Sequence, residues 1–402
     1  MKGDEGFRIA YCTIASANYL ARVQYFVHTL QQNQLGAKVF VLLCEADAVR
    51  ERITSETGFP FLSPQQILPP DWREMAFQYG IIEFNTAVKP FLMEYILDQG
   101  FNGVFYFDPD IAIYSQLGEL EEALRTHDVV LTPHACHPVP DDGLSPAMAD
   151  YLRAGQFNLG FIGMAGSKNG RNMLAWWKSV CRDRCIFDSS YRFFVDQFWA
   201  AAFASFAERL YVFRHPGANV AYWNLFQRDI SRPGSRWEVD DHPLLFFHFS
   251  GLATDNLTRV SRYQNRVTAA VGSPLHQLLT DYVQAIRQQP WGCYGAEPYS
   301  FACYCDGTPV AADERRNYLM LSWPDKKKLA DPFSSPERVR AIVSISINGD
   351  MRSYLARIRL ERYIRTAQFL GHELREKLRS RGMVKTMHLA IRFAWRKLMQ
   401  RF

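Results

Sequence analysis

The chain has 402 residues, of which 48% are apolar and 22% charged, and its formal net charge is +5. With 9 Trp, 19 Tyr and 29 Phe, it has ample material for a large core, which excludes an intrinsically disordered protein and predicts a catalytic-size domain with an appended segment. No apolar stretch approaches the roughly 18 residues of a membrane-spanning helix, and residues 1–20 lack the pattern of a secretory signal, so we expect a cytoplasmic protein.

Strand and helix patterns alternate over the first hundred residues. The predicted elements are strands at 8–14, 38–44 and 104–107 and helices at 18–32 and 87–97. Such alternation is typical of an α/β protein whose parallel strands are joined by crossover helices.

The pattern continues with a lower density of strands. We predict strands at 128–131, 157–164 and 244–249 and helices at 172–180 and 195–206. From about residue 275 the strand patterns fade, and the last fifty residues are helical and basic.

The charge of the C-terminal tail differs from that of the body. Residues 350–402 hold 14 Lys or Arg and 4 Asp or Glu, a net charge of +10, whereas the remainder carries −5. Six apolar residues recur on one helical face: Val384, Met387, Ile391, Trp395, Leu398 and Phe402. This pattern predicts an interfacial helix at 384–402 that docks on an anionic membrane, and packing on the body or on a second subunit is the alternative. No nucleic-acid-binding module is recognisable.

The segment Asp108-Pro109-Asp110 directly follows the predicted strand 104–107. Ligands of open α/β sheets bind at the carboxyl ends of strands, and carboxylate oxygens suit Mg²⁺ or Mn²⁺ that is shared with a diphosphate. The alternative is that Asp108 only begins a turn before Pro109.

The sequences at 86–97 and 104–114 resemble the helix, strand and metal-binding turn of nucleotide-sugar glycosyltransferases with the GT-A fold. Three later segments follow in the order of motifs in the glycogenin and lipopolysaccharide galactosyltransferase group: Phe157-Asn-Leu-Gly-Phe161, Phe194-Val-Asp-Gln-Phe-Trp199 and Phe246-Phe-His-Phe-Ser-Gly251. The resemblance covers about residues 7–265.

The resemblance implies a Rossmann-like α/β fold with a central mixed sheet flanked by helices. It implies a GT-A domain at 1–265, with a donor half at about 1–114 and an acceptor half at about 115–265. A mixed helical and loop extension would follow at 266–349, and the basic helical tail at 350–402.

By the same resemblance, Asp108 and Asp110 hold a divalent ion with His248 as third ligand. Mn²⁺ or Mg²⁺ would serve, and an imidazole ligand favours Mn²⁺. The alternative for His248 is a core histidine among aromatic neighbours. The resemblance also places Thr13, Ala15 and Tyr19 around the base and ribose of the donor.

Further candidates concern the donor and the transferred sugar. Glu45 would accept hydrogen bonds from ribose hydroxyls, and the alternative is a solvated acid at the start of a helix. Lys89 would contact the diphosphate or the sugar, and the alternative is a lysine on the surface. Asn158 would bind the donor sugar, and Asp196 and Gln197 would be the catalytic pair.

The segment 215–224 is a candidate sugar-binding wall on its own composition. It places two amides near two aromatic rings, and sugars stack well on aromatic faces. We therefore add Asn219, Trp223 and Asn224 to the donor-binding candidates.

Two departures from the group leave its chemistry open. Phe198 stands where a second acid is usual, and Leu252-Ala-Thr-Asp-Asn-Leu257 replaces the Lys-Pro-Trp that follows the histidine motif. Arg262 or Arg266 would substitute for the missing lysine at the diphosphate. Whether the reaction retains or inverts configuration stays open, with retention preferred.

Neither the cysteines nor the loop histidines predict another metal site. The eight cysteines lack zinc-type spacing and should be reduced thiols, and prolines around His134 and His137 disfavour a shared helix.

The predicted function is metal-dependent hexosyl transfer from a nucleoside diphosphate sugar to a hydroxyl of a glycan, lipid-linked or protein acceptor. We expect a role in bacterial surface-glycan assembly, in the cytoplasm or at the inner face of the membrane. Two alternatives are a haloacid-dehalogenase-like phosphohydrolase, with Asp108 as nucleophile and Asp110 as acid, and a non-enzymatic membrane-associated scaffold.

Overall fold

The computed structural model describes residues 6–188 and 193–346. By their contacts the residues form two compact units. The first comprises Met1–Leu319 and Asp331–Pro336, and the second comprises Met320–Ala330 and Glu337–Phe402. The predicted amphipathic helix at 384–402 lies outside the described residues. None of the helices within the described ranges is both long enough and apolar enough to cross a bilayer.

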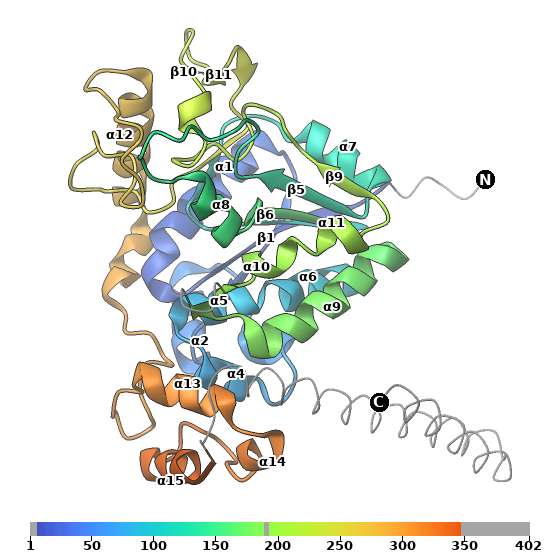
Figure 1. Ribbon diagram of the computed structural model, residues 1–402, viewed down its shortest axis with the longest axis vertical. Helices are drawn as coiled ribbons and strands as arrows, with labels where there is room; N and C mark the ends of the chain where they lie inside the picture. Colours follow the sequence, from blue (N-terminus) through green and yellow to red (C-terminus); the bar gives the residue numbers. More distant parts are fainter. Residues whose placement is uncertain (1–5, 189–192, 347–402) are drawn as a thin grey trace, which may run out of the picture. The chain divides into compact units, whose positions relative to one another are not determined.

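A six-stranded mixed sheet forms the centre of the first unit (Figure 1). Its strands are β1 (Ile9–Ala15), β2 (Lys38–Leu43), β3 (Gly103–Phe107), β5 (Val129–Pro133), β6 (Phe157–Ala165) and β9 (Leu210–Val212). They lie in the order β2-β1-β3-β6-β5-β9, and β6 runs antiparallel to both of its neighbours, whereas β1 is parallel to β2 and β3. The predicted central mixed sheet is confirmed.

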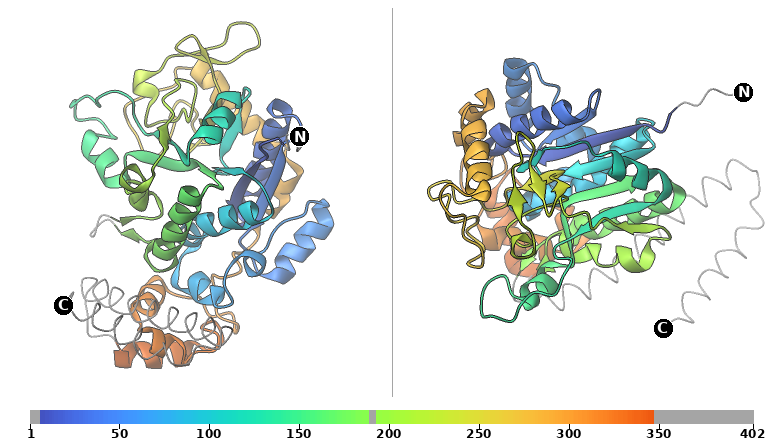
Figure 2. Two further views of the ribbon diagram at one scale, coloured as in Figure 1. Left: turned by 90° about the vertical axis from the view of Figure 1, so that its right-hand side faces the viewer. Right: turned by 90° about the horizontal axis from the view of Figure 1, so that it is seen from above.

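Helices cover both faces of this sheet (Figures 1 and 2). On one face lie α1 (Leu20–Asn33) and α7 (Gly118–Thr126), and on the other lie α6 (Lys89–Asp98) and α9 (Lys168–Arg184). Successive side chains of a strand point to opposite faces of the sheet. Tyr11, Phe105 and Phe107 point to the same face and share one core with the apolar residues of α1 and α7. Because both faces are covered, all nine residues of β6 are buried.

Shorter elements complete the architecture. The remaining helices are α2 (Asp47–Thr57), α3 (Pro64–Ile67), α4 (Trp72–Gln78), α5 (Ile81–Ala87), α8 (Met148–Ala154), α10 (Gln197–Ala200), α11 (Phe203–Phe206), α12 (Pro274–Arg287), α13 (Ala312–Met320), α14 (Trp323–Lys326) and α15 (Pro336–Ser346). The 3-10 turns are η1 (Ala17–Tyr19), η2 (Leu225–Gln227) and η3 (Pro290–Ala296). The short strands are β4 (Ile111–Ile113), β7 (Phe187–Asp188), β8 (Phe193–Phe194), β10 (Ile230–Ser231), β11 (Glu238–Val239), β12 (His242–Pro243) and β13 (Phe246–His248).

The single helix predicted at 195–206 is wrong. The segment forms two four-residue helices, α10 and α11. Val195 has a φ of 41°, outside the right-handed helical region, so no helix can begin before Asp196.

Residues 266–319 belong to the first unit and pack closely in it. The buried face of α12 joins a core with Phe247 and Phe249 around β13, and η3 contacts both α1 and η1. The domain boundary at 265 stays a prediction.

Candidate functional site

Asp108, Asp110 and His248 form an acid–histidine cluster at the carboxyl end of β3. Each offers one ligand atom, and these atoms all lie within 4.8 Å of one another. His248 Nε2 is 3.1 Å from Asp110 Oδ1 and 3.8 Å from Asp108 Oδ2. Two carboxylates and an imidazole are a suitable ligand set for Mn²⁺ or Mg²⁺, so these side chains fit the expected ion.

Strand pairing brings the histidine to the acids. The turn after β3 leads into β4, which pairs antiparallel with β13, and this register sets His248 opposite Ile111. A side chain at Gly160 of β6 would block the arrangement, because its Cβ would lie 2.4 Å from His248 Cε1 and 2.7 Å from Asn158 Oδ1. A glycine at position 160 is therefore needed for the imidazole to lie here.

The acid–histidine cluster is strongly coupled by charge. Burial alone would lower the pKa of His248, but the carboxylates of Asp110 and Asp108 outweigh it and hold that pKa above its usual value. Burial likewise opposes ionisation of Asp110, yet the charge and hydrogen bond of His248, together with the charge of Arg22, outweigh burial and lower the pKa of the Asp110 carboxyl. The two carboxylates thus favour a positive charge between them, which a divalent cation can also supply.

Lys89 is a buried cation beside the cluster. Its Nζ lies 3.1 Å from Asp196 Oδ2 and 3.4 Å from Asp108 Oδ1, and it donates to the Leu159 carbonyl at 2.9 Å. Burial lowers the pKa of Lys89, but the two carboxylates outweigh this effect and raise it. The side chain is only 3% exposed, so the surface alternative for Lys89 is wrong, and in this structure the ammonium joins Asp196 to Asp108.

Asp196 lies at the start of α10 with its side chain 2% exposed. Burial raises the pKa of this carboxyl to about 6, although Lys89 opposes the rise. The preceding Val195, a β-branched residue, adopts a φ of 41°, a strained conformation of the kind that clusters at functional sites. The Asp196 carboxylate that follows this residue contacts Lys89.

The side-chain amides of Gln197 and Asn158 form hydrogen bonds with each other and with the backbone. Gln197 Oε1 accepts from Leu159 N at 3.0 Å and from Asn158 Nδ2 at 3.2 Å, and its Nε2 donates to the Ala154 carbonyl at 2.7 Å. Asn158 Oδ1 accepts from Gly160 N and from Asn219 Nδ2, both at 3.1 Å. Their roles at the sugar stay predictions, although both amides already have protein partners.

Asn219 and His134 extend these contacts, and we call Asn158, Gln197, Asn219 and His134 the amide network. Asn219 Nδ2 also donates to Thr132 Oγ1 at 2.8 Å, and Asn158 Nδ2 lies 3.3 Å from His134 Nε2. Burial lowers the pKa of His134 to about 4, so this imidazole is neutral at pH 7. Sequence reasoning did not predict His134 at this place.

The other two members of the predicted sugar wall differ from each other. Asn224 is fully buried, and it accepts from Ala221 N at 2.9 Å and donates to the Asn219 carbonyl at 3.0 Å. The Trp223 ring lies edge-on to His248 with centroids 5.1 Å apart. Within the described ranges, the buried atoms Trp223 Nε1 and Asn219 Oδ1 have no hydrogen-bond partner. Such atoms are unusual in proteins and are available to a ligand.

The predicted nucleoside-binding residues Thr13 and Ala15 lie at the end of β1, and Tyr19 follows in η1. Thr13 is fully buried, and its Oγ1 has no partner among the described residues. Ala15 is also buried, whereas Tyr19 is 36% exposed. Glu45 lies 1% exposed, so the solvated alternative is wrong.

Both carboxylate oxygens of Glu45 bind backbone amides: Ala17 N at 3.0 Å and Ser300 N at 2.8 Å. Burial raises its pKa against the opposing effect of these hydrogen bonds. Glu45 therefore ties the turn after β1 to a loop 255 residues away.

The two arginines proposed to bind the diphosphate have different surroundings in the structure. Arg266 is engaged with Asp142 and with the carbonyls of Leu144 and Pro146. Arg262 is exposed, and its charge acts on Tyr19. Sequence reasoning missed Arg22, whose guanidinium lies 4.6 Å from the Tyr19 ring and whose charge helps to lower the pKa of Asp110. Its position three residues after Tyr19 on α1 was the available signal.

No second metal cluster accompanies this one within residues 6–188 and 193–346. His134 belongs to the amide network, whereas His137 Nδ1 lies 3.0 Å from Gln227 Oε1. All eight cysteines are free.

No protein-family model matches the chain. It is 22% identical over 252 residues to the uncharacterised protein YfnD of Bacillus subtilis (strain 168), covering 60% of this chain and 77% of YfnD. It is 23% identical over 262 residues to YfnF of the same strain, covering 63% and 84%. A solved structure of the galactosyltransferase LgtC with donor and acceptor sugar analogues aligns with a TM-score of 0.42 and 16% identity, over 71% of this chain and 99% of LgtC.

Proposed function

We propose that this chain is a metal-dependent glycosyltransferase that moves a hexosyl group from a nucleoside diphosphate sugar to a hydroxyl acceptor. The convergence of Asp108, Asp110 and His248 within 4.8 Å at the carboxyl end of β3 is the observation that carries this proposal. Ligands of open α/β sheets bind at this edge, and hard divalent ions there are typically shared with substrate phosphates.

Each side chain of the acid–histidine cluster has one role in this proposal. Asp108 and Asp110 would hold Mn²⁺ or Mg²⁺ through oxygen, and His248 would hold it through the Nε2 that faces both carboxylates. When bound, the ion supplies positive charge that stabilises the departing diphosphate. Arg22 and Arg262 add positive charge on the side of Tyr19.

The nucleoside would bind at the end of β1. The partly exposed ring of Tyr19 offers an aromatic face to the base, and the unpartnered Thr13 Oγ1 offers a hydrogen bond. Asn219 Oδ1 and Trp223 Nε1, also unpartnered in the described ranges, are suited to hydroxyl groups of the donor sugar.

The setting of Asp196 supports a charge-stabilising role. A general base must reach the acceptor hydroxyl within hydrogen-bond distance, but this carboxylate is 2% exposed and held by Lys89. A fixed negative charge beside the anomeric carbon instead stabilises the positive charge that develops as the sugar–phosphate bond breaks. This arrangement favours retention of configuration.

The wider role is part of the same proposal. We propose a glycan or lipid-linked acceptor in bacterial surface-glycan assembly, at the cytoplasmic face of the membrane. The basic amphipathic pattern at 384–402 supports attachment to anionic lipid.

A product assay on the full-length protein tests the proposal. The protein is incubated with a panel of nucleoside diphosphate sugars, with Mn²⁺ or with a chelator, and the released nucleotide and phosphate are separated by chromatography. We expect nucleoside diphosphate release that requires the ion.

The alternatives predict different products in that assay. Release of inorganic phosphate would favour the phosphohydrolase, and a chain that binds no nucleotide sugar in calorimetry would favour the scaffold. Either outcome contradicts transfer.

A further inference from the structure

A second cavity lies at the opposite edge of the sheet, away from the acid–histidine cluster. Its volume is about 470 Å³, within the size range of small-molecule sites. It is lined by residues just before β3 and just after β6, such as Asn102 and Gly166, whereas Asp108 follows the other end of β3. The length of β3 therefore separates the two places.

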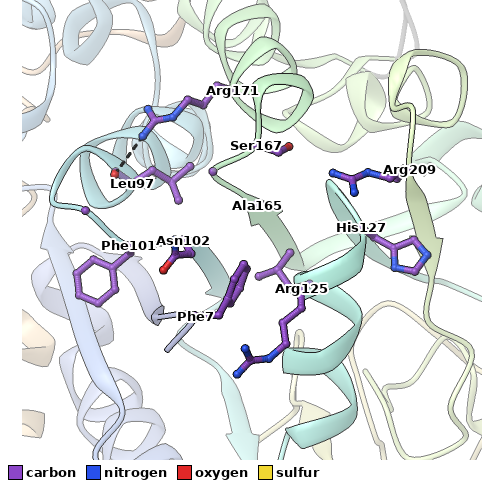
Figure 3. A pocket seen from close by; sticks show the side chains of 13 residues that line it. Phe7, Leu97, Phe101, Asn102, Arg125, His127, Ala165, Ser167, Arg171 and Arg209 are labelled. Carbon is purple, nitrogen blue, oxygen red and sulfur yellow. Dashed lines mark hydrogen bonds between the residues drawn. The ribbon is translucent and has the colours of Figure 1, made fainter. Parts of the chain in front are cut away.

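The lining of this cavity is cationic. Arg125, Arg171 and Arg209 line it together with His127, and no Asp or Glu is among the described residues that do so. These side chains come from three places in the fold: Arg125 and His127 from the end of α7, Arg171 from the first turn of α9, and Arg209 from the residue before β9 (Figure 3). Three arginine side chains around one cavity make it attractive to an anion.

Outer contacts hold two of the arginines in place while leaving donors available. Arg171 binds Asp98 at 2.6 Å through Nη1 and the Leu97 carbonyl at 3.1 Å through Nη2. Arg209 binds Asp128 at 2.7 Å through Nη2 and at 3.3 Å through Nε. A guanidinium has five N–H donors in a fixed fork, so each keeps donors beyond these contacts.

Asp128 remains a carboxylate at neutral pH. Its burial raises the pKa, but the hydrogen bonds from Arg209 and Ser167 outweigh burial and hold the pKa below the usual value. Ser167 caps α9, a helix of 17 residues whose first turn faces the cavity, and the helix dipole adds partial positive charge there.

Aromatic rings form the other part of the wall. Phe7 and Phe101 line the cavity, with Arg125 lying 5.1 Å from the Phe7 ring centroid and Arg8 lying 4.7 Å from that of Phe101. Flat apolar faces next to guanidinium groups suit a sugar ring that carries an anionic substituent.

We infer that this cavity is a second ligand site that binds a phosphate ester carried on a sugar-sized body. The volume accommodates more than the phosphate, the arginines recognise the phosphate oxygens, and the phenylalanine faces cover the ring. The ligand is either a free sugar phosphate or one unit of a phosphate-containing glycan. The inference stands apart from the proposed catalysis, because none of the lining residues belongs to the catalytic site.

Calorimetric titration of the full-length protein tests this inference with three probes. Glucose 6-phosphate supplies the monoester, the phosphodiester of glucose and glycerol supplies a polymer-like unit, and glucose alone supplies the ring. We expect the monoester to bind and glucose not to bind. Equal binding of the diester would assign the site to a polymer unit, and binding of the monoester alone would assign it to a free sugar phosphate.

Variants show whether the binding belongs to this cavity. Arg171→Gln and Arg125→Gln remove charges whose acidic partners are exposed. Each substitution should lower the affinity for the monoester by about tenfold or more. Arg153→Gln is the matched control, because Arg153 also pairs with an acid on a helix surface but lies outside the cavity. Asp110→Ala should leave this binding unchanged.

Three results would overturn the inference: no binding by the parent protein, equal weakening by Arg153→Gln, or loss of binding in Asp110→Ala. Thermal unfolding midpoints within about 2 °C of the parent would show that the arginine variants are folded.

Discussion

The acid–histidine cluster and the amide network lie side by side, yet they satisfy their polar groups differently. In the acid–histidine cluster, two carboxylates converge on His248 Nε2 at 3.1 and 3.8 Å, so groups of opposite charge hold one another. In the amide network, Gln197 and Asn158 bind neutral protein partners with both of their polar groups.

This difference indicates a division of labour. A cluster of converging charges can exchange a proton for a cation, and its function should depend on each charge. Within the amide network, Gln197 and Asn158 have their polar groups satisfied by the protein, so they should mainly fix the backbone on which the charged groups stand. The following predictions test that division, from the largest expected effect to the smallest.

Asp110→Ala should reduce metal-dependent transfer by roughly 1,000-fold or more, because it removes a charged ligand whose ion contributes several kcal/mol to the transition state. The measurement is nucleoside diphosphate release against Mn²⁺ concentration. The exposed Asp255→Ala is the control. Parent-like turnover by Asp110→Ala would remove the basis of the metal site.

Asp196→Asn should lower turnover by about 100-fold, since it keeps the shape of the side chain and removes its charge. Donor binding, followed by calorimetry with Mn²⁺, should change by less than about threefold. A large loss of donor affinity with unchanged turnover would show that Asp196 acts on binding and not on the reaction.

His248→Asn should weaken activation by Mn²⁺ by about 10- to 100-fold, which is less than the loss of a carboxylate, because carboxylates and substrate phosphates can hold a hard ion without imidazole. Activity is measured at low and saturating Mn²⁺, with His276→Asn as a control outside the site. If His248 is only a core residue, the melting temperature will fall while the Mn²⁺ dependence stays that of the parent.

Asn158→Ala should act mainly on stability. It removes partners from Gly160 N, Asn219 and Gln197, and unsatisfied buried groups cost about 1–3 kcal/mol. Urea unfolding should show this loss, while the activity of the folded fraction stays within about tenfold of the parent. A fall of 100-fold at unchanged stability would make Asn158 a direct donor ligand.

The pH dependence of stability should reflect His134. Its folded pKa of about 4 lies below the usual value of 6.5. Its contribution is therefore complete above pH 6.5 and is lost as the pH falls toward 4, by on the order of 3 kcal/mol. Urea unfolding at pH 7.5 and 5 should show a smaller drop for His134→Gln than for the parent. Equal drops would place the titration elsewhere.

Sequence reasoning found the parts of the site that local pattern determines. Asp108 and Asp110 directly follow an apolar run, and the strands near 8–14, 104–107 and 157–164 were predicted from their composition and are present. His248 was found through the order of motifs, because strand pairing over more than a hundred residues has no local signal.

The remaining parts depend on tertiary contacts. The burial of Lys89 requires the Leu159 carbonyl on β6, and Glu45 requires a loop near Ser300. The helix α2 was missed because its sequence is largely polar and only Ile53 is buried. Choosing between Arg262 and Arg266 required the position of Asp142, which lies in a distant loop.

The antiparallel placement of β6 has a consequence for shortened forms of the chain. β3 lies between β1 and β6 and consists of the fully buried apolar run Gly103–Phe107. A fragment that ends between residues 114 and 156 would contain β1, β2 and β3 but not β6, and β3 would become an exposed edge strand. Such an edge offers unpaired backbone groups and large apolar side chains to another copy. Fragments of that length should therefore aggregate, and soluble N-terminal fragments should extend at least through Ala165.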